Sequence, residues 1–283
     1  MTENRNMAIA YDFDGTLAPG NMQEHNFIPD LNMDKREFWQ EANEMAKKND
    51  MDEVSAYMHL MLIKAKEKNI PIREEVFMRY GEKITFFEGV TGYFDRINAY
   101  AAERNIRLEH FIISSGLREF VKGTAIAKHF KSIFASGFQY DDDGIACWPA
   151  LVVNYTNKTQ YLFRINKGIY NSYDNTLINK SMPEDQRTVP FSNFIYIGDG
   201  ETDVPAMKMV NLYGGTTIAV YNPQSPTAKH VCLNLIKQNR SDYIAPTVYT
   251  AGGELDTMLK KIIDKVATEQ DLLNIKYQEV NRQ

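Results

Sequence analysis

Five short apolar runs, each followed by polar or glycine-rich residues, constrain the fold of this chain more than any other feature. They occupy residues 7–11, 111–113, 132–135, 194–197 and 217–220. Each run is short enough for a buried strand, and segments with helical periodicity lie between most of them. Strands that alternate with helices form a parallel sheet covered on both faces. The sequence therefore predicts an α/β fold with a three-layer, doubly wound parallel sheet.

The stretch from residue 18 to about residue 87 interrupts this alternation, because it carries helix signals and no convincing strand. The pairs Asp34/Glu37 and Asp50/Glu53 have the spacing of a capping box, which favours a helix start. After the second pair, apolar residues recur along one helical face. They are Val54, Tyr57, Met58, Met61, Leu62 and Ala65.

This interruption predicts two domains. Residues 18–86 are expected to form an α-helical cap domain inserted after the first strand. Residues 1–17 and 87–283 are expected to form the Rossmann-like catalytic core. Within the core, residues 139–152 indicate a hairpin, and the polar residues 171–193 indicate a long surface loop.

Charge and cysteine content limit the partners and the compartment. The net charge is −5, from 32 Lys and Arg against 37 Asp and Glu, and no basic stripe is present, which argues against nucleic acid as a partner. The two cysteines, Cys147 and Cys232, are far apart and are expected to be buried thiols. No apolar run approaches the roughly 18 residues of a membrane span, and no signal peptide is apparent. We expect a cytoplasmic protein that does not insert into a membrane.

Two acidic clusters directly follow predicted strands. Asp12 and Asp14 follow the first strand, and Asp199 and Asp203 follow the fourth. The carboxyl ends of parallel strands are where open α/β sheets bind their ligands, so both clusters can converge there. Carboxylate oxygens, carbonyls and water are the ligands of a hard cation such as Mg²⁺.

Four motifs of this chain resemble those of the haloacid dehalogenase superfamily and occur in that family's order. They are D-F-D-G-T at residues 12–16, F-I-I-S-S-G at 111–116, Lys158 with the helix expected to begin there, and G-D-G-E-T-D at 198–203. The arrangement is most similar to the phosphoserine-phosphatase-like branch, which has a helical cap directly after the first motif.

The resemblance implies roles for the carboxylates. Asp12 would be the nucleophile that forms an aspartyl-phosphate, and Asp14 would protonate the leaving oxygen and then activate water. Mg²⁺ would be held by the Asp12 carboxylate, the Asp14 backbone carbonyl and Asp199. Asp203 would lie outside the direct ligands and position either the metal-bound waters or Lys158.

The resemblance also implies a phosphoryl-binding set. Ser114 and Lys158 would hold the phosphoryl oxygens through a hydroxyl and an ammonium. Gly15, Ser115 and Gly116 would contribute backbone N–H groups.

Lys167 is the rival of Lys158 for this role. The two lysines are nine residues apart, which places them roughly 180° around a helix, so that they cannot both face the site. Lys158 begins the apolar stripe of this predicted helix and is preferred.

These features favour a Mg²⁺-dependent phosphatase that hydrolyses a small phosphomonoester. A phosphotransferase or phosphomutase that uses the same aspartyl-phosphate is an alternative that the motifs do not separate. A non-catalytic phosphometabolite-binding protein is a further alternative, but the nucleophile and Asp14 are both present. The cap does not obviously repeat the amino-acid-binding residues of phosphoserine phosphatase, so that substrate is not carried over.

Overall fold

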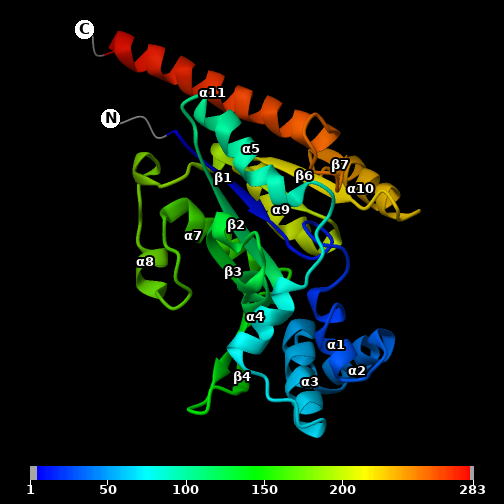
Figure 1. Cartoon of the computed structure of the whole chain (residues 1–283). Coiled ribbons are helices and arrows are strands. Elements are labelled where there is room, and N and C mark those ends of the chain that lie inside the picture. Colours follow the sequence, from blue (N-terminus) through cyan, green and yellow to red (C-terminus); the bar gives the residue numbers. More distant parts are fainter. Residues whose placement is uncertain (1–4, 281–283) are drawn as a thin grey trace.

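The computed structural model describes residues 5–280, apart from the side chains of Glu201 and residues 277–280. A seven-stranded sheet runs through the molecule in the order β4-β3-β2-β1-β5-β6-β7 (Figure 1). All neighbouring strands are parallel except β3 and β4, which are antiparallel. The strands are β1 (Asn6–Tyr11), β2 (Arg107–Leu117), β3 (Phe130–Tyr140), β4 (Ala146–Leu151), β5 (Phe194–Gly198), β6 (Thr216–Tyr221) and β7 (Tyr243–Pro246).

This sheet confirms the predicted fold class. Each of the five apolar runs lies in a strand, and the predicted hairpin joins β3 to β4. The sequence reading missed β7, a four-residue edge strand that ends in a proline and is only partly buried.

Two helical layers cover the sheet, and alternate residues of β1 face each of them. Met7, Ile9 and Tyr11 belong to one hydrophobic cluster, together with residues of α5 (Val90–Ala102) and α11 (Glu254–Val280). Ala8 and Ala10 belong to the other cluster. That second layer consists of α7 (Lys158–Lys167), α9 (Val204–Leu212) and α10 (Ala228–Lys237). Burial on both faces explains why β1 is an unbroken apolar run rather than an alternating one.

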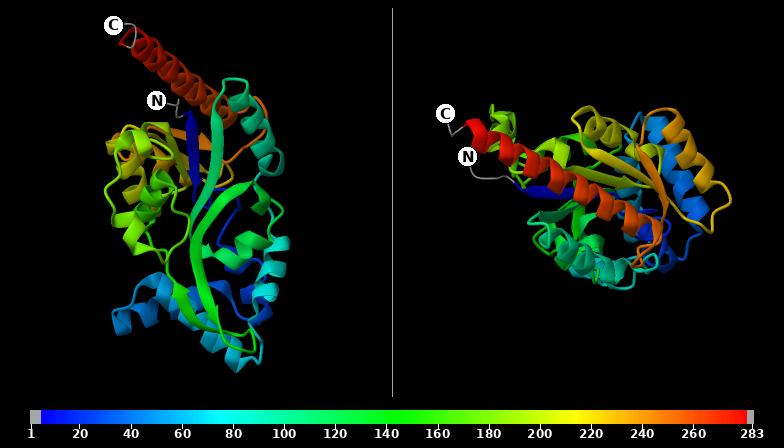
Figure 2. Two further views of the ribbon diagram at one scale, coloured as in Figure 1. Left: turned by 90° about the vertical axis from the view of Figure 1, so that its left-hand side faces the viewer. Right: turned by 90° about the horizontal axis from the view of Figure 1, so that it is seen from above.

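Four helices and no strand lie in residues 18–86, all of which are described, as the sequence predicted. They are α1 (Phe27–Asp30), α2 (Lys35–Asn49), α3 (Glu53–Glu67) and α4 (Glu74–Glu82). These helices gather at one end of the sheet, and α11 extends from the other (Figures 1 and 2).

The helix starts agree with the capping prediction at one position and differ at the other. Asp34 caps α2, because its carboxylate accepts hydrogen bonds from the backbone N–H groups of residues 36 and 37. The second prediction was wrong by two residues, since Asp52 rather than Asp50 caps α3. Asp50 ends α2 instead, in the left-handed conformation at φ 52°. That conformation is common for Asp and Asn at the end of a helix.

The helices of residues 18–86 pack closely on the remainder of the chain. Helix α4 contacts the short helix α6 (Arg118–Gly123), which follows β2. A Cβ atom on Gly81 would lie 2.0 Å from the carbonyl oxygen of Phe120. Helices can approach this closely only where a side chain is missing. The domain boundaries themselves remain a prediction.

The polar stretch 171–193 is less irregular than a plain loop. It contains α8 (Asn175–Asn179) and two 3₁₀ turns, Glu184–Gln186 and Phe191–Asn193. The buried guanidinium of Arg164 donates to the carbonyl oxygens of Asn171, Ser172 and Asp174. One charged group thus satisfies several backbone acceptors and holds the segment against α7.

Two expectations about the surface can be compared with the structure. Cys232 is buried as expected, but the prediction for Cys147 was wrong, because β4 is an edge strand and leaves this thiol exposed. Among the described helices, none combines the length and the apolar character needed to cross a membrane.

Candidate active site

The sheet order brings the two acidic motifs together. Strand β1 lies between β2 and β5, so the chain winds outward in opposite directions from the β1–β5 boundary. The boundary where the strand order reverses is the usual ligand site of a doubly wound sheet. Asp12 follows β1, and Asp199 follows β5. The backbone N–H of Asp12 continues the ladder by donating to Ile197 O at 2.9 Å.

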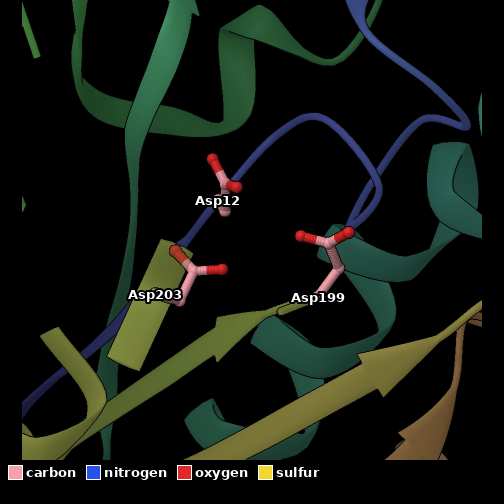
Figure 3. A group of neighbouring side chains, drawn as sticks. All are labelled: Asp12, Asp199 and Asp203. Atoms are coloured by element: carbon pink, nitrogen blue, oxygen red, sulfur yellow. The ribbon is translucent and has the colours of Figure 1, made fainter. Parts of the chain in front are cut away.

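Three carboxylates converge at this boundary (Figure 3). One oxygen atom from each of Asp12, Asp199 and Asp203 lies within 4.8 Å of the other two. Asp12 and Asp203 are buried, and the Oδ2 atom of Asp203 has no hydrogen-bond partner among the described residues. Hard oxygen donors at this spacing, one of them buried and unpaired, fit a small divalent cation such as Mg²⁺.

Gly15 makes room for this cluster. Its backbone has φ +73°, and a Cβ atom there would lie 2.1 Å from Asp199 Oδ2. A larger residue would therefore be strained and would also displace the carboxylate. The glycine of the first motif thus allows the loop after β1 to approach the loop after β5.

Lys158 is the buried cation of the site. It is the first residue of α7, and its Nζ lies 3.1 Å from Asp12 Oδ1 and 2.7 Å from Asp203 Oδ1. Burial alone would lower the pKa of Lys158, but the charges of Asp12 and Asp203 outweigh it and raise that pKa above its usual value. Lys158 is therefore an ammonium over the whole neutral range.

Lys167 takes no part in this arrangement. Its Nζ donates to Ile178 O and Lys180 O, which belong to the polar stretch 171–193. The preference for Lys158 over Lys167 agrees with these positions, since the two side chains leave α7 in different directions.

Asp14, the second aspartate of the first motif, has a different environment from Asp12. Asp14 Oδ1 accepts a hydrogen bond from Met22 N at 3.0 Å. Burial raises the pKa of Asp14 well above its usual value, and the charge of Asp12 raises it further. This shift favours the protonated form of Asp14, which can donate a proton.

Asp12 and Asp199 also hold protons more tightly than usual. Burial raises the pKa of Asp199 to about 8, with a further contribution from the charge of Asp12. Burial raises the pKa of Asp12 to about 6, although Lys158 opposes this shift. Carboxylates crowded in this way are stabilised by any cation that they share.

The serines of the second motif lie at the edge of the same site. Ser114 is buried, and its Oγ accepts a hydrogen bond from Gly116 N at 3.0 Å. Ser115 Oγ is buried without a partner among the described residues. A Cβ atom on Gly116 would lie 3.1 Å from Asp14 Oδ2 and still closer to the Met22 side chain.

A cavity of about 600 Å³ lies between the loops that carry these motifs and helices α2 and α3. Asp12, Asp14, Ser114, Lys158 and Asp199 lie at the sheet end of the cavity. Helices α2 and α3 form another part of its wall, through Trp39, Ala42, Asn43, Glu53, Val54 and Tyr57. Apart from Asp203, which is fully buried and contacts Lys158, the structure places every sequence-predicted site residue on the lining of this cavity.

Three contributors were missed by the sequence reading. Tyr196 donates to Asp203 Oδ1 at 2.7 Å, and the backbone N–H of Met22 donates to Asp14. Tyr57 donates from α3 to Ser115 O at 2.6 Å. Tyr57 belongs to the predicted apolar stripe of its helix, but no pattern in the sequence distinguishes a stripe residue that reaches the site from one that packs in the cap.

Comparison with known proteins agrees with this geometry. Residues 9–208 match the family model of the haloacid dehalogenase-like hydrolases. An uncharacterised protein of Borreliella burgdorferi is 31% identical over 287 aligned positions, which cover 90% of this chain and 96% of the relative.

Solved structures share the fold at low identity. A haloacid dehalogenase family hydrolase from Salmonella enterica serovar Typhi aligns with a TM-score of 0.56 and 16% identity, over 91% of this chain and 71% of the other. A phospho-aspartyl intermediate analogue of phosphoserine phosphatase aligns with a TM-score of 0.54 and 15% identity, over 90% and 98%. The family match covers most of the chain and includes all four motifs. This chain is therefore an enzyme of the haloacid dehalogenase-like hydrolase family.

Proposed function

We propose that this enzyme is a Mg²⁺-dependent phosphatase that hydrolyses small phosphomonoesters through an aspartyl-phosphate on Asp12. The observation that carries the proposal is that the buried ammonium of Lys158 contacts one carboxylate oxygen of Asp12 and leaves the other free within the described part of the chain. Asp12 Oδ1 accepts from Phe13 N at 2.8 Å and faces Lys158 Nζ, whereas Oδ2 has no hydrogen-bond partner among the described residues. Oδ2 is therefore the oxygen available for phosphorus.

The cation would be held by Asp12 and Asp199, with the Asp14 backbone carbonyl completing the protein ligands. When bound, it would offset the repulsion between the Asp12 carboxylate and an anionic phosphoryl group. Asp203 would keep Lys158 in place through the 2.7 Å contact, and Tyr196 would hold the same Asp203 oxygen.

In the first step, Asp12 Oδ2 attacks phosphorus, and the bond from phosphorus to the ester oxygen breaks. Asp14 gives its proton to the departing oxygen, which leaves as an alcohol. The raised pKa of Asp14 supports this role, because it favours the protonated carboxyl group that can donate. Ser114, Lys158 and the backbone N–H groups of Gly15, Ser115 and Gly116 would bind the phosphoryl oxygens.

In the second step, Asp14 accepts a proton from a water molecule, whose oxygen attacks phosphorus. The bond between phosphorus and Asp12 breaks, and inorganic phosphate is released. Asp12 returns as a carboxylate, and Asp14 is again protonated, so both residues are regenerated.

The helices of residues 18–86 would act as a cap that encloses the substrate. Their contribution to the cavity wall and the hydrogen bond from Tyr57 to Ser115 O support this role. Enclosure would exclude bulk water during the first step. A cytoplasmic location is proposed on the two free cysteines, Cys147 and Cys232.

The test is phosphate release from p-nitrophenyl phosphate with Mg²⁺, with EDTA, and with added acceptor alcohols. We expect Mg²⁺-dependent release, and a loss of at least about 1,000-fold in Asp12→Asn, because the amide cannot attack phosphorus. Asp185→Asn, in the exposed 3₁₀ turn of the polar stretch, is the matched control and should retain activity.

Full activity in Asp12→Asn would refute the covalent mechanism. Transfer of phosphate to the acceptor in place of release would identify a phosphotransferase. No turnover of any phosphomonoester would favour a binding protein.

A further inference from the structure

The charged side chains that line the cavity are mostly acidic. Among the described residues that line the cavity, Lys158 is the only lysine or arginine. Its ammonium is already shared between Asp12 and Asp203. The wall therefore offers no basic side chain to a second anionic group on the substrate.

Two aromatic side chains form part of the cap wall. The rings of Trp39 and Tyr57 meet edge to face, with centroids 5.6 Å apart. Their polar atoms are occupied, because Trp39 Nε1 donates to Glu24 Oε1 at 2.9 Å and Tyr57 Oη donates to Ser115 O. What these residues offer the cavity is the surface of their rings.

Glu53 supplies a negative charge on the same wall. It is the first residue of α3, its side chain is exposed toward the cavity, and it has no cationic partner among residues 5–280. The neighbouring Asp52 is fully used, since Oδ1 caps α3 and Oδ2 accepts from Asn154 Nδ2 at 2.9 Å. Glu53 is therefore the acidic group of this wall that remains available to a ligand.

We propose, building on the phosphatase function above, that the preferred substrate is a phosphomonoester of a small amino alcohol. Its ammonium group would lie against the rings of Trp39 and Tyr57 and pair with the Glu53 carboxylate. An alcohol that carries a carboxylate or a second phosphate is disfavoured, because this anion would lose water without gaining a basic partner.

The experiment compares kcat/KM for compounds that differ by one charged group. Phosphoethanolamine carries an ammonium, ethyl phosphate carries no second charge, O-phosphoserine adds a carboxylate to the ammonium, and phosphoglycolate carries a carboxylate alone. We expect phosphoethanolamine to exceed ethyl phosphate severalfold and phosphoglycolate at least tenfold, with O-phosphoserine below phosphoethanolamine.

Variants at Glu53 test whether this residue causes the preference for the ammonium-bearing substrate. Glu53→Gln should bring kcat/KM for phosphoethanolamine to within about twofold of that for ethyl phosphate. Glu53→Lys should raise the relative rate for phosphoglycolate. Glu82→Gln removes the same charge from an exposed position on α4, outside the cavity lining, and should leave every ratio unchanged.

Three outcomes would overturn the inference and leave the phosphatase function intact. They are equal turnover of all four compounds, a preference for the carboxylate-bearing compounds, and an ammonium preference that survives Glu53→Gln. If neither these compounds nor p-nitrophenyl phosphate is hydrolysed, the proposed function fails, and the substrate inference fails with it.

Discussion

Tyr57 of the cap helix α3 donates a hydrogen bond of 2.6 Å to the carbonyl oxygen of Ser115, which lies near the end of β2. The same carbonyl also accepts from Ser136 Oγ at 3.2 Å. The hydrogen bond between Tyr57 and Ser115 joins helix α3 to β2, the strand that carries the second motif.

Tyr57→Phe removes this hydrogen bond and keeps the ring. We expect the free energy of unfolding to fall by about 0.5–1.5 kcal/mol, because Ser115 O keeps its bond from Ser136. We also expect KM to rise more than kcat falls, since the cap is held less firmly over the cavity. Denaturant titration and steady-state kinetics measure the two effects. A variant with unchanged stability and KM would show that the contact does not hold the cap.

Gly15→Ala should abolish most activity. The new Cβ atom would lie 2.1 Å from Asp199 Oδ2, and φ +73° is unfavourable for alanine. Gly200→Ala is the matched control in the loop of the fourth motif, because a Cβ atom there meets nothing within 4 Å. We expect weaker Mg²⁺ binding and at least about 100-fold lower kcat/KM in Gly15→Ala, and near-normal values in Gly200→Ala. Similar kinetics in both variants would contradict the close approach of the two loops.

Lys158→Met should cost both activity and stability, because Asp12 and Asp203 would lose the ammonium between them. Removing one partner of a buried ion pair typically costs about 3–5 kcal/mol. Protonation of one carboxylate would reduce that loss. Lys167→Met, on the same helix, removes only hydrogen bonds to Ile178 O and Lys180 O and should keep full activity. Equal losses of activity and stability in the two variants would show that Lys158 has no special role in the site.

The metal-free protein should lose stability as the pH rises from 6.5 to 8, above the range in which His110 contributes. The pKa of Asp199 is raised to about 8, above its value in the unfolded chain, so the folded state binds the extra proton. The contribution of protonated Asp199 to the free energy of unfolding is fully present below pH 4. It is lost as the pH rises through the pKa of Asp199 in the folded state, by up to about 1.4 kcal/mol per pH unit.

Thermal unfolding with EDTA measures this loss, and Asp199→Asn is the control, with a shallower pH dependence. Mg²⁺ should stabilise the wild-type protein more at pH 8 than at pH 6, because protons compete with the cation for the carboxylates. Equal stabilisation at both pH values would contradict a site made of these groups.

A buried histidine of β2, His110, should destabilise the protein in acid. His110 Nδ1 and Nε2 lie 2.9 Å from Tyr11 Oη and Asn98 Oδ1, which suits the neutral ring. Burial lowers the pKa of His110 to about 3, with a smaller contribution from the charge of His129. A lowered folded pKa means that stability falls as the pH drops below the ordinary value near 6.5.

Between pH 6.5 and 4.5 this group should cost about 2–3 kcal/mol. The NMR signal of His110 should show no protonation at pH 4.5 in the folded protein, and His110→Asn should flatten the acid limb of the stability curve. Titration of His110 near pH 6.5 in the folded state would contradict the prediction.

Much of the architecture follows from the sequence, for a local reason. A buried parallel strand must be apolar on both faces, and β1 and β5 show this directly as unbroken apolar runs. The site motifs are also local, because each consists of a few residues directly after a strand or at the start of a helix. The short edge strand β7 was missed because an exposed edge needs no such pattern.

The tertiary structure decided which of these local pieces meet. Asp203 was expected outside the direct metal ligands, and the fold places it against Lys158 and Tyr196 with one oxygen unpaired. Tyr57 and Ser115 are 58 residues apart, and their contact depends on how α3 packs over β2. Contacts of this kind depend on the packing of whole elements rather than on the spacing of neighbouring residues. The local motifs therefore indicate which residues belong to the candidate site, whereas the packing of whole helices places Trp39, Glu53 and Tyr57 on the wall of its cavity.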